Sequence, residues 1–111
     1  MPAIKAPQRG DIWLAALDPT LGSEIQKTRP CVVVSPPEMN EHLRTVVVAP
    51  MTTGSRPAPF RIPIAFQRKN GLILLDRLRT LDRQRLVKRL GAVKPATLAS
   101  VLDALAAMFA P

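Results

Sequence analysis

The run Thr45-Val46-Val47-Val48-Ala49-Pro50, continued by Met51-Thr52-Thr53-Gly54, is typical of a β-strand that ends in a loop. Further short runs rich in Val and Ile and bounded by Pro and Gly lie on both sides of it, at residues 11–17, 30–35, 60–66, 72–78 and, shorter, 89–93. Their order predicts a small meandering barrel of antiparallel strands. Pro63 cannot donate a ladder hydrogen bond, so we expect the strand over 60–66 at an edge or a bulge.

A helix is predicted only at the end of the chain. After Lys94-Pro95, apolar residues recur at three- and four-residue steps, at Leu98, Val101, Leu102, Leu105 and Phe109. This spacing gives an α-helix one apolar face, and a proline fits its first turn. We therefore expect a single mainly β (α+β) domain over residues 1–111, with about five to seven antiparallel strands and an amphipathic C-terminal helix packed on the barrel.

The chain is basic, with 16 Lys and Arg against 8 Asp and Glu and a net charge of +8. The whole excess falls between residues 61 and 94, where Asp76 and Asp82 are the acidic residues and the basic ones are Arg61, Arg68, Lys69, Arg77, Arg79, Arg83, Arg85, Lys88, Arg89 and Lys94. Such a segment suits a polyanion such as nucleic acid. It also suits an acidic protein segment, or a solvated surface that keeps the protein soluble.

Cysteine use and hydropathy narrow the class further. Cys31 is the only cysteine and lies inside an apolar run, so we expect a small core residue and neither a disulfide framework nor a metal cluster. Residues 1–8 lack the apolar stretch of a signal peptide, and no run approaches the length that spans a bilayer. These features predict a cytoplasmic protein that does not contact a membrane.

Candidate chemistry lies at the ends of strands. Arg29, in Lys27-Thr28-Arg29-Pro30, opens one strand, and Thr52-Thr53 follows another. A guanidinium can clamp a phosphate through its planar set of donors, and a threonine hydroxyl can add a neutral hydrogen bond beside it. Two long loops, 18–28 and 51–59, adjoin these residues, and long loops on rigid scaffolds commonly carry function. Together these features point to phosphodiester chemistry on RNA.

Fragments that run almost from end to end form a specific set, although each one alone is weak. They are Arg9-Gly10-Asp11-Ile12-Trp13, Leu17-Asp18-Pro19-Thr20-Leu21-Gly22-Ser23-Glu24, Arg29-Pro30, Ser35-Pro36, Asn40, Val48-Ala49-Pro50-Met51-Thr52-Thr53, Pro59-Phe60, Gly71, and Leu74-Leu75-Asp76 with Arg79 and Asp82. In this order and spacing they resemble the MazF/PemK (Kid) type toxins of bacterial type II toxin–antitoxin systems, which are sequence-specific endoribonucleases.

The resemblance implies an SH3-like barrel of the CcdB/PemK-like toxin class and a homodimer. It also implies cleavage of single-stranded RNA with no metal and no cofactor. In that reaction the RNA 2′-hydroxyl attacks the adjacent phosphate, leaving a 2′,3′-cyclic phosphate and a 5′-hydroxyl end. The partner that it implies is a MazE-like antitoxin whose acidic disordered tail wraps the dimer.

The resemblance further implies roles for individual residues. Arg29 matches the principal catalytic residue, which stabilises the pentacoordinate phosphorane, and Thr52 matches the threonine that assists at the phosphate. Asp76 matches an acidic residue implicated in RNA cleavage or binding, and Arg77 stands after it where the family commonly has Gln. The residues expected to bind RNA or to support the site are Glu24, Lys27, Thr53, Arg56, Asp76, Arg77 and Arg79.

Structural roles stay open for several of these residues. A salt bridge to Glu24 or Asp18 would occupy Arg29. Asp76 would be a paired carboxylate that steadies one of the two arginines following it, Arg77 or Arg79. Thr52 and Thr53 both fit turn residues that cap their strand, a role that suits Thr53 more than Thr52. Glu24 fits equally a residue that orients Arg29 and one that accepts hydrogen bonds from base edges.

Other functions are also compatible with the sequence. A non-enzymatic toxin of the same barrel class that inhibits DNA gyrase, as CcdB does, would need no pair of Arg29 and Thr52. A passive nucleic-acid-binding barrel would bind without cutting, and a degenerate toxin would keep only antitoxin binding.

Overall fold

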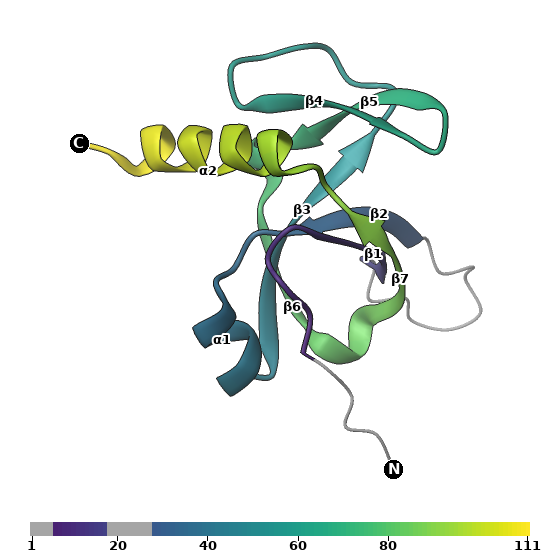
Figure 1. Cartoon of the computed structure of the whole chain (residues 1–111), viewed down its shortest axis with the longest axis vertical. Coiled ribbons are helices and arrows are strands. Elements are labelled where there is room, and N and C mark those ends of the chain that lie inside the picture. Colours follow the sequence, from purple (N-terminus) through teal and green to yellow (C-terminus); the bar gives the residue numbers. More distant parts are fainter. Residues whose placement is uncertain (1–5, 18–27) are drawn as a thin grey trace.

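The computed structural model describes residues 6–17 and 28–111 and shows a curled antiparallel sheet with a helix near the C-terminal end (Figure 1). Its elements are β1 (Asp11–Ala16), β2 (Thr28–Val33), α1 (Pro37–His42), β3 (Thr45–Thr52), β4 (Arg61–Phe66), β5 (Lys69–Leu74), the 3₁₀ turn η1 (Leu75–Arg77), β6 (Arg79–Asp82), the 3₁₀ turn η2 (Arg83–Arg85), β7 (Leu86–Ala92) and α2 (Pro95–Phe109). This order confirms the mainly β fold with a C-terminal helix that the sequence predicts.

Strand β3 organises the sheet. On one side it pairs with β2, where Val48 lies opposite Val33. On its other side residues 45–48 pair with β6, whereas the last two residues of β3 pair with β5. Pro50, which has no N–H to donate, lies in the gap between those two pairings. The strand therefore carries Thr52 to the point where β5 joins the sheet.

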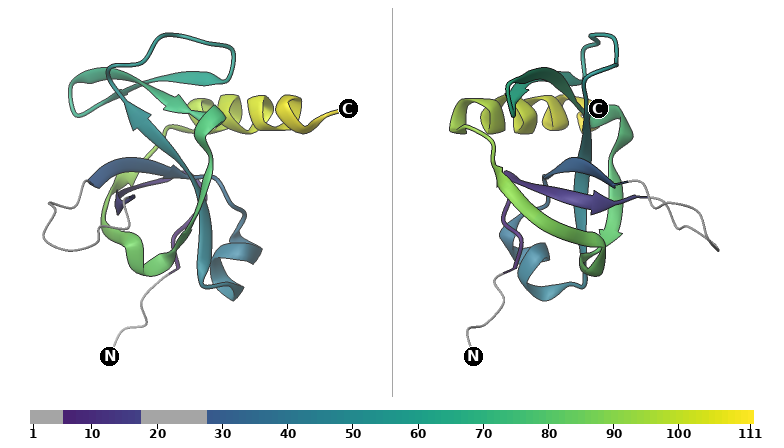
Figure 2. Two further views of the ribbon diagram at one scale, coloured as in Figure 1. Left: turned by 180° about the vertical axis from the view of Figure 1, so that it is seen from behind. Right: turned by 90° about the vertical axis from the view of Figure 1, so that its right-hand side faces the viewer.

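The edges of the sheet agree with the proline pattern. The strand order is β4-β5-β3-β2-β1-β7, with β6 beside β3. Strand β4 is therefore an edge strand, as Pro63 predicts, and Pro63 lies opposite Leu72 of β5. Two further views show that the β4–β5 hairpin and α2 lie at one end of the molecule, while α1 lies at the other (Figure 2).

Two apolar clusters fill the interior. One joins Ile12 and Ile73 of the sheet to Val101 of α2, and the other surrounds Cys31 and Leu81. Full burial of one aliphatic side chain of this size contributes about 1.5–3 kcal/mol. Helix α2 contacts β4 and η1 and buries Val101 completely, so this part of its apolar face packs on the sheet as expected. Phe109, expected on the same face, is instead 73% exposed, because it lies at the end of the helix.

Helix α1 is an element that the sequence patterns do not predict. It is held by a buried polar network in place of an apolar face. The Ser35 hydroxyl donates to the Asn40 side-chain oxygen, and the Asn40 amide donates to the Ser35 carbonyl at 2.9 Å. The same hydroxyl accepts from the Val47 N–H at 3.0 Å, which ties the helix to β3. Short polar helices fixed in this way leave no periodic signal in a sequence.

The strand expected over residues 72–78 is wrong in extent. Strand β5 begins earlier, at Lys69, and ends at Leu74. The chain then passes through η1 before β6 starts. Leu75 is fully buried although it lies in the turn, and its N–H donates to the Phe60 carbonyl at 3.0 Å. The apolar run therefore reports burial across a turn and not one continuous strand. The last strand, β7, is likewise longer than the 89–93 expected.

Candidate active site

One cavity collects side chains from four strands. It has a volume of about 310 Å³ and lies between the ends of β2 and β3 and the β4–β5 hairpin, at the small end of the range of about 300–1,000 Å³ usual for ligand pockets. Its lining residues are Arg29, Pro30, Met51, Thr52, Thr53, Ile64, Phe66, Gln67, Lys69 and Gly71. Three residues singled out in the sequence, Arg29, Thr52 and Thr53, therefore meet in one place.

Arg29 stands on a rigid strand with its side chain in solvent. Strand β2 changes from exposed at Thr28 and Arg29 to buried from Cys31 onward, so its inner half anchors the outer half. The backbone of Arg29 lies opposite Ala15 of β1. Among the described residues, the Arg29 guanidinium has no hydrogen-bond or ion-pair partner. Its donors are therefore open to an anion from that part of the chain.

Thr52 ends β3 with its hydroxyl in a local turn. The hydroxyl oxygen accepts from the Gly54 N–H at 3.2 Å, the pattern of a short side-chain turn. Its hydroxyl hydrogen remains able to donate to a ligand. Thr53 is exposed beside it, and the side-chain turn is made by Thr52 and not by Thr53.

Gly71 sets the distance between β5 and the end of β3. A Cβ built on Gly71 would lie 2.7 Å from the Thr52 carbonyl oxygen and 3.4 Å from the Thr52 carbonyl carbon. A backbone oxygen cannot move aside as a flexible side chain can, so any larger residue must push the two strands apart. The absence of a side chain at Gly71 thus allows β5 to lie close to the end of β3, where Thr52 lines the cavity.

We expect Gly71→Ala to lower the free energy of unfolding by about 1–3 kcal/mol, because the added methyl group meets the Thr52 carbonyl. Urea denaturation followed by circular dichroism measures the change. Gly54→Ala is the matched control, since nothing lies within 4 Å of a Cβ at Gly54 and its φ is not positive. Equal stability of the two variants would contradict this account of Gly71.

The β4–β5 hairpin contributes residues that sequence reasoning missed. Phe66 lies opposite Lys69, so the turn consists of Gln67 and Arg68 alone, both with positive φ, 51° and 64°. Two-residue turns of this kind are usually signalled by Asn-Gly or Asp-Gly. Because neither glycine nor asparagine marks this turn, the sequence gives no clear signal that Phe66, Gln67 and Lys69 face the cavity.

The charge of the cavity favours an anion. Arg29 and Lys69 bring two cationic groups, and the two threonines bring hydroxyls. Among the described residues, the lining contains no carboxylate, imidazole or thiol. A phosphate between Arg29 and Thr52 would meet donors and no repelling charge.

Asp76 lies outside this lining and pairs with Arg61. Two hydrogen bonds join them, from Arg61 Nη2 to Asp76 Oδ2 at 3.0 Å and from Arg61 Nε to Asp76 Oδ1 at 3.2 Å. Hydrogen bonding from Arg61 holds the pKa of Asp76 below its usual value. Arg61 also donates to the Arg56 carbonyl at 3.0 Å. The prediction that Asp76 is a paired carboxylate is therefore confirmed. The expected partner is wrong, because Asp76 pairs with Arg61 of β4 and not with Arg77 or Arg79, which follow it in the chain.

Arg79 also has a structural partner. Its Nη2 donates to the Leu17 carbonyl at 2.9 Å, and Arg85 Nη1 donates to the Ala16 carbonyl at 3.3 Å. Both arginines thereby anchor the chain at the end of β1, next to residue 17, the last described residue before residue 28. Arg56 and Arg77 are exposed and are not among the cavity-lining residues. Glu24 and Lys27 lie outside the described residues.

Cys31 lies close enough to the site for Arg29 to influence the pKa of its thiol, but it is not suited to act as a nucleophile. Burial raises the pKa of its thiol to about 12, against the opposing effects of Arg79 and Arg29. At neutral pH the group is a neutral thiol, which is a poor nucleophile. Cys31 is a core residue, as its place in an apolar run predicts.

Comparison with known proteins gives the family. A model of the family described as "PemK-like, MazF-like toxin of type II toxin-antitoxin system" matches residues 8–109. The chain belongs to this toxin family. The resemblance found in the sequence is thereby confirmed, and the toxin's cavity lies wholly within the matched range.

Two relatives and one solved structure illustrate the similarity. The toxin is 39% identical over 104 residues to "Endoribonuclease PemK" of Escherichia coli, covering 88% of this chain and 78% of that relative. It is 34% identical over 104 residues to "Endoribonuclease MazF" of Staphylococcus epidermidis, covering 88% and 87%. A mycobacterial endoribonuclease solved in complex with its cognate antitoxin matches with a TM-score of 0.76 at 30% identity, over 92% of this chain and 93% of that one.

Two further observations concern the described part of the toxin, residues 6–17 and 28–111. There, no three His, Cys, Asp or Glu side chains lie together in a way that could hold a metal ion. None of the helices in that part is long and apolar enough to cross a membrane.

Proposed function

We propose that this toxin is an endoribonuclease that cuts single-stranded RNA at a short sequence motif. The observation that carries the proposal is that one cavity brings Arg29, unpaired among the described residues, to Thr52. The relatives that match most of this chain are named endoribonucleases, which supports the same activity.

The reaction that suits these groups uses the RNA as its own nucleophile. The 2′-hydroxyl oxygen attacks the adjacent phosphorus and loses its proton to a solvent water, and the bond from phosphorus to the 5′ oxygen breaks. That oxygen takes up a proton, so the products are a 2′,3′-cyclic phosphate and a 5′-hydroxyl end. A pentacoordinate phosphorane forms between these steps, and its non-bridging oxygens carry the extra negative charge.

Arg29 acts chiefly by stabilising that charge. A guanidinium stays protonated in proteins, so it is a poor base but a strong double donor to phosphate oxygens. Donors fixed in advance at a developing charge supply the largest single catalytic effect in many enzymes. Thr52 donates a neutral hydrogen bond to the same phosphate.

The supporting residues act around this centre. Thr53 and Lys69 lie beside Thr52 in the lining and suit contacts to the same or a neighbouring phosphate. Arg56 and Arg77 are exposed cations for flanking phosphates, while Asp76 and Arg79 hold the loops in place through their own partners. Glu24 and Lys27 complete the set as contacts from residues 18–27.

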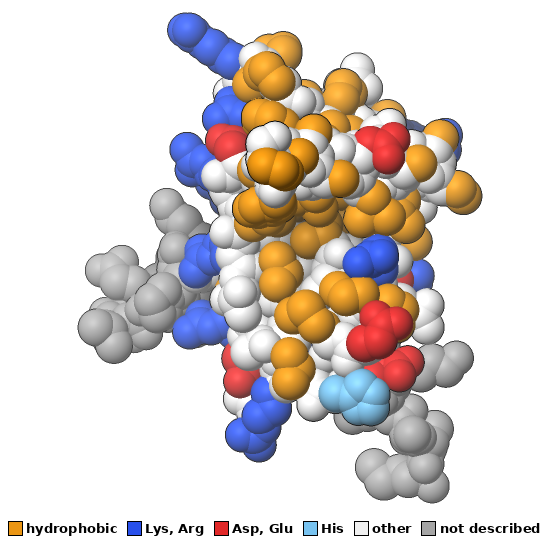
Figure 3. Space-filling model, turned by 90° about the vertical axis from the view of Figure 1, so that its left-hand side faces the viewer, with side chains coloured by type: hydrophobic (Ala, Val, Ile, Leu, Met, Phe, Trp, Pro, Cys, Tyr) orange, Lys and Arg blue, Asp and Glu red, His pale blue; other side chains and the backbone are white. Residues whose placement is uncertain are grey.

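The partners follow from charge and exposed apolar surface. Net charge of +8 suits both RNA and the acidic tail of a MazE-like antitoxin, so we expect the two to compete. Apolar side chains gather over α2 and on the surface beside it (Figure 3), and Phe109 at the end of α2 is 73% exposed. A homodimer that covers this apolar surface accounts for it. The toxin acts in the cytoplasm, where its RNA substrate lies.

Incubating the toxin with a long defined single-stranded RNA in EDTA tests the proposal, with sequencing of the new 5′ ends. We expect discrete cuts that share a short motif, at a rate that the chelator leaves unchanged, because the nucleophile and the stabilising charge come from RNA and Arg29. If EDTA abolished cleavage and magnesium restored it, the assigned chemistry would be wrong. RNA binding without cleavage would indicate a binding module or degenerate toxin, and the absence of both would make gyrase inhibition the next test.

A further inference from the structure

The β4–β5 hairpin holds two residues in a backbone conformation that is rare for their type. Gln67 and Arg68 have φ of 51° and 64°, in the left-handed region that residues other than Gly, Asn and Asp seldom adopt. Positive φ at both residues is the mark of a type I′ turn, in which Asn-Gly meets the demand without strain. Strained residues of this kind cluster at active sites and ligand-binding sites.

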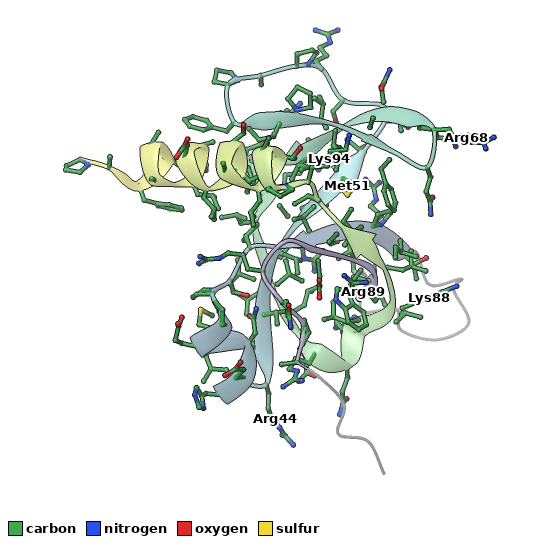
Figure 4. All side chains as sticks on the ribbon, viewed as in Figure 1. Arg44, Met51, Arg68, Lys88, Arg89 and Lys94 are labelled. Atoms are coloured by element: carbon green, nitrogen blue, oxygen red, sulfur yellow. The ribbon has the colours of Figure 1, made fainter. Side chains whose placement is uncertain are left out.

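The two turn residues differ in what their side chains meet. Gln67 lines the cavity that also holds Arg29 and Thr52. Arg68 is not part of that lining. Its side chain points away from the body of the protein at the hairpin tip, whereas Met51, which lines the cavity, lies near the middle of the molecule (Figure 4). Among the described residues, the Gln67 amide has no hydrogen-bond partner. The turn thus places Gln67, an exposed residue whose amide is unpaired among the described residues, at the lining of the cavity.

An amide adds what the other groups of the cavity lack. Arg29, Lys69 and Thr52 supply charge and hydroxyl donors that suit phosphate. The Gln67 amide presents an acceptor and two donors in one plane, the pattern that matches the edge of an unpaired base. Phe66, half-buried next to it, supplies ring surface in the same lining on which a base can stack.

We propose that Gln67 reads one base of the recognised RNA motif, next to the scissile phosphate, through hydrogen bonds from its side-chain amide to the base edge. This inference rests on the proposed function and names a specificity-determining residue for it. It also explains the strained turn, because an Asn-Gly turn would keep the hairpin but would place a shorter amide side chain at position 67.

A matched pair of glycine substitutions tests the proposal. Gln67→Gly and Arg68→Gly each remove one side chain from the left-handed region, so both variants should melt at or above the temperature of the unchanged toxin. RNA from a random pool is sequenced after cleavage and, separately, after capture by the bound toxin. For Gln67→Gly we expect preference at one motif position to fall by roughly 5- to 100-fold, with the other positions unchanged. Arg68→Gly should keep the full motif.

Each other outcome contradicts the inference in its own way. An unchanged motif in Gln67→Gly would show that its amide reads no base, while cleavage by the unchanged toxin would still support the endoribonuclease. A motif altered equally in both variants would assign recognition to the shape of the hairpin. If the unchanged toxin did not cut, the proposed function would fail, and the captured RNA would still report whether Gln67→Gly alters base preference.

Discussion

Replacing Arg29 by alanine is expected to lower the rate of RNA cleavage by at least about 10²-fold, because one fixed donor to a developing oxyanion contributes about that much. The change should leave the fold intact, since the Arg29 side chain is exposed and its guanidinium has no partner among the described residues. Surface changes of this kind usually shift stability by less than about 0.5 kcal/mol. Cleavage is measured under single-turnover conditions, with RNA binding measured by fluorescence anisotropy.

Two further variants separate charge from geometry at this position. Arg29→Lys keeps the charge but loses the planar pair of donors, so its rate should lie between those of the alanine variant and the unchanged toxin. Arg68→Ala removes an arginine that points away from the cavity and should cut normally. Full activity in Arg29→Ala would assign catalysis elsewhere, and a loss of RNA binding equal to the loss of rate would make Arg29 a binding residue only.

The part of the site that was predictable from sequence lies on strands with strong patterns. Arg29 and Thr52 each stand at the end of an apolar run, and the pairing of β2 with β3 brings those ends to one side of the sheet. Period-two runs and strand boundaries are local signals, so they survive without knowledge of the tertiary structure. The place of Pro63 at an edge was predictable for the same reason.

The part that was not predictable depends on contacts across the fold. The cavity closes only because β4 and β5 fold back over β3, and the tight turn that does this carries Gln67 and Arg68 in place of its usual residues. Asp76 follows an apolar run just as Thr52 does, yet Arg61 reaches it from 15 positions earlier in the chain. No local sequence pattern shows which arginine pairs with Asp76, because the partner depends on where β4 lies in the folded protein.

A single 2′-deoxy substitution on the nucleotide immediately 5′ to the scissile phosphate is expected to abolish cleavage at that bond. The substitution removes the attacking oxygen, and neither Arg29 nor Thr52 can replace a missing nucleophile. Binding should stay close to that of the all-RNA substrate, because contacts to phosphates and base edges are unchanged. Cleavage is followed with a labelled oligonucleotide that holds one copy of the motif.

The position of the missing hydroxyl makes this experiment specific for the proposed chemistry. Moving the same 2′-deoxy substitution to the nucleotide 3′ of the scissile phosphate keeps the nucleophile, so cutting should continue there. Products of the unmodified RNA should accept a label from polynucleotide kinase at the new 5′ end without prior phosphatase, since the departing 5′ oxygen leaves as a hydroxyl.

Cleavage of the bond that lacks its 2′-hydroxyl would instead require water as the attacking group. Water, like the 2′-hydroxyl, must lose a proton as it attacks, and among the described residues the cavity lining holds no carboxylate or imidazole to accept it. That result would move the search for the catalytic group to residues 18–27, where Glu24 is the carboxylate nearest to Arg29 in sequence.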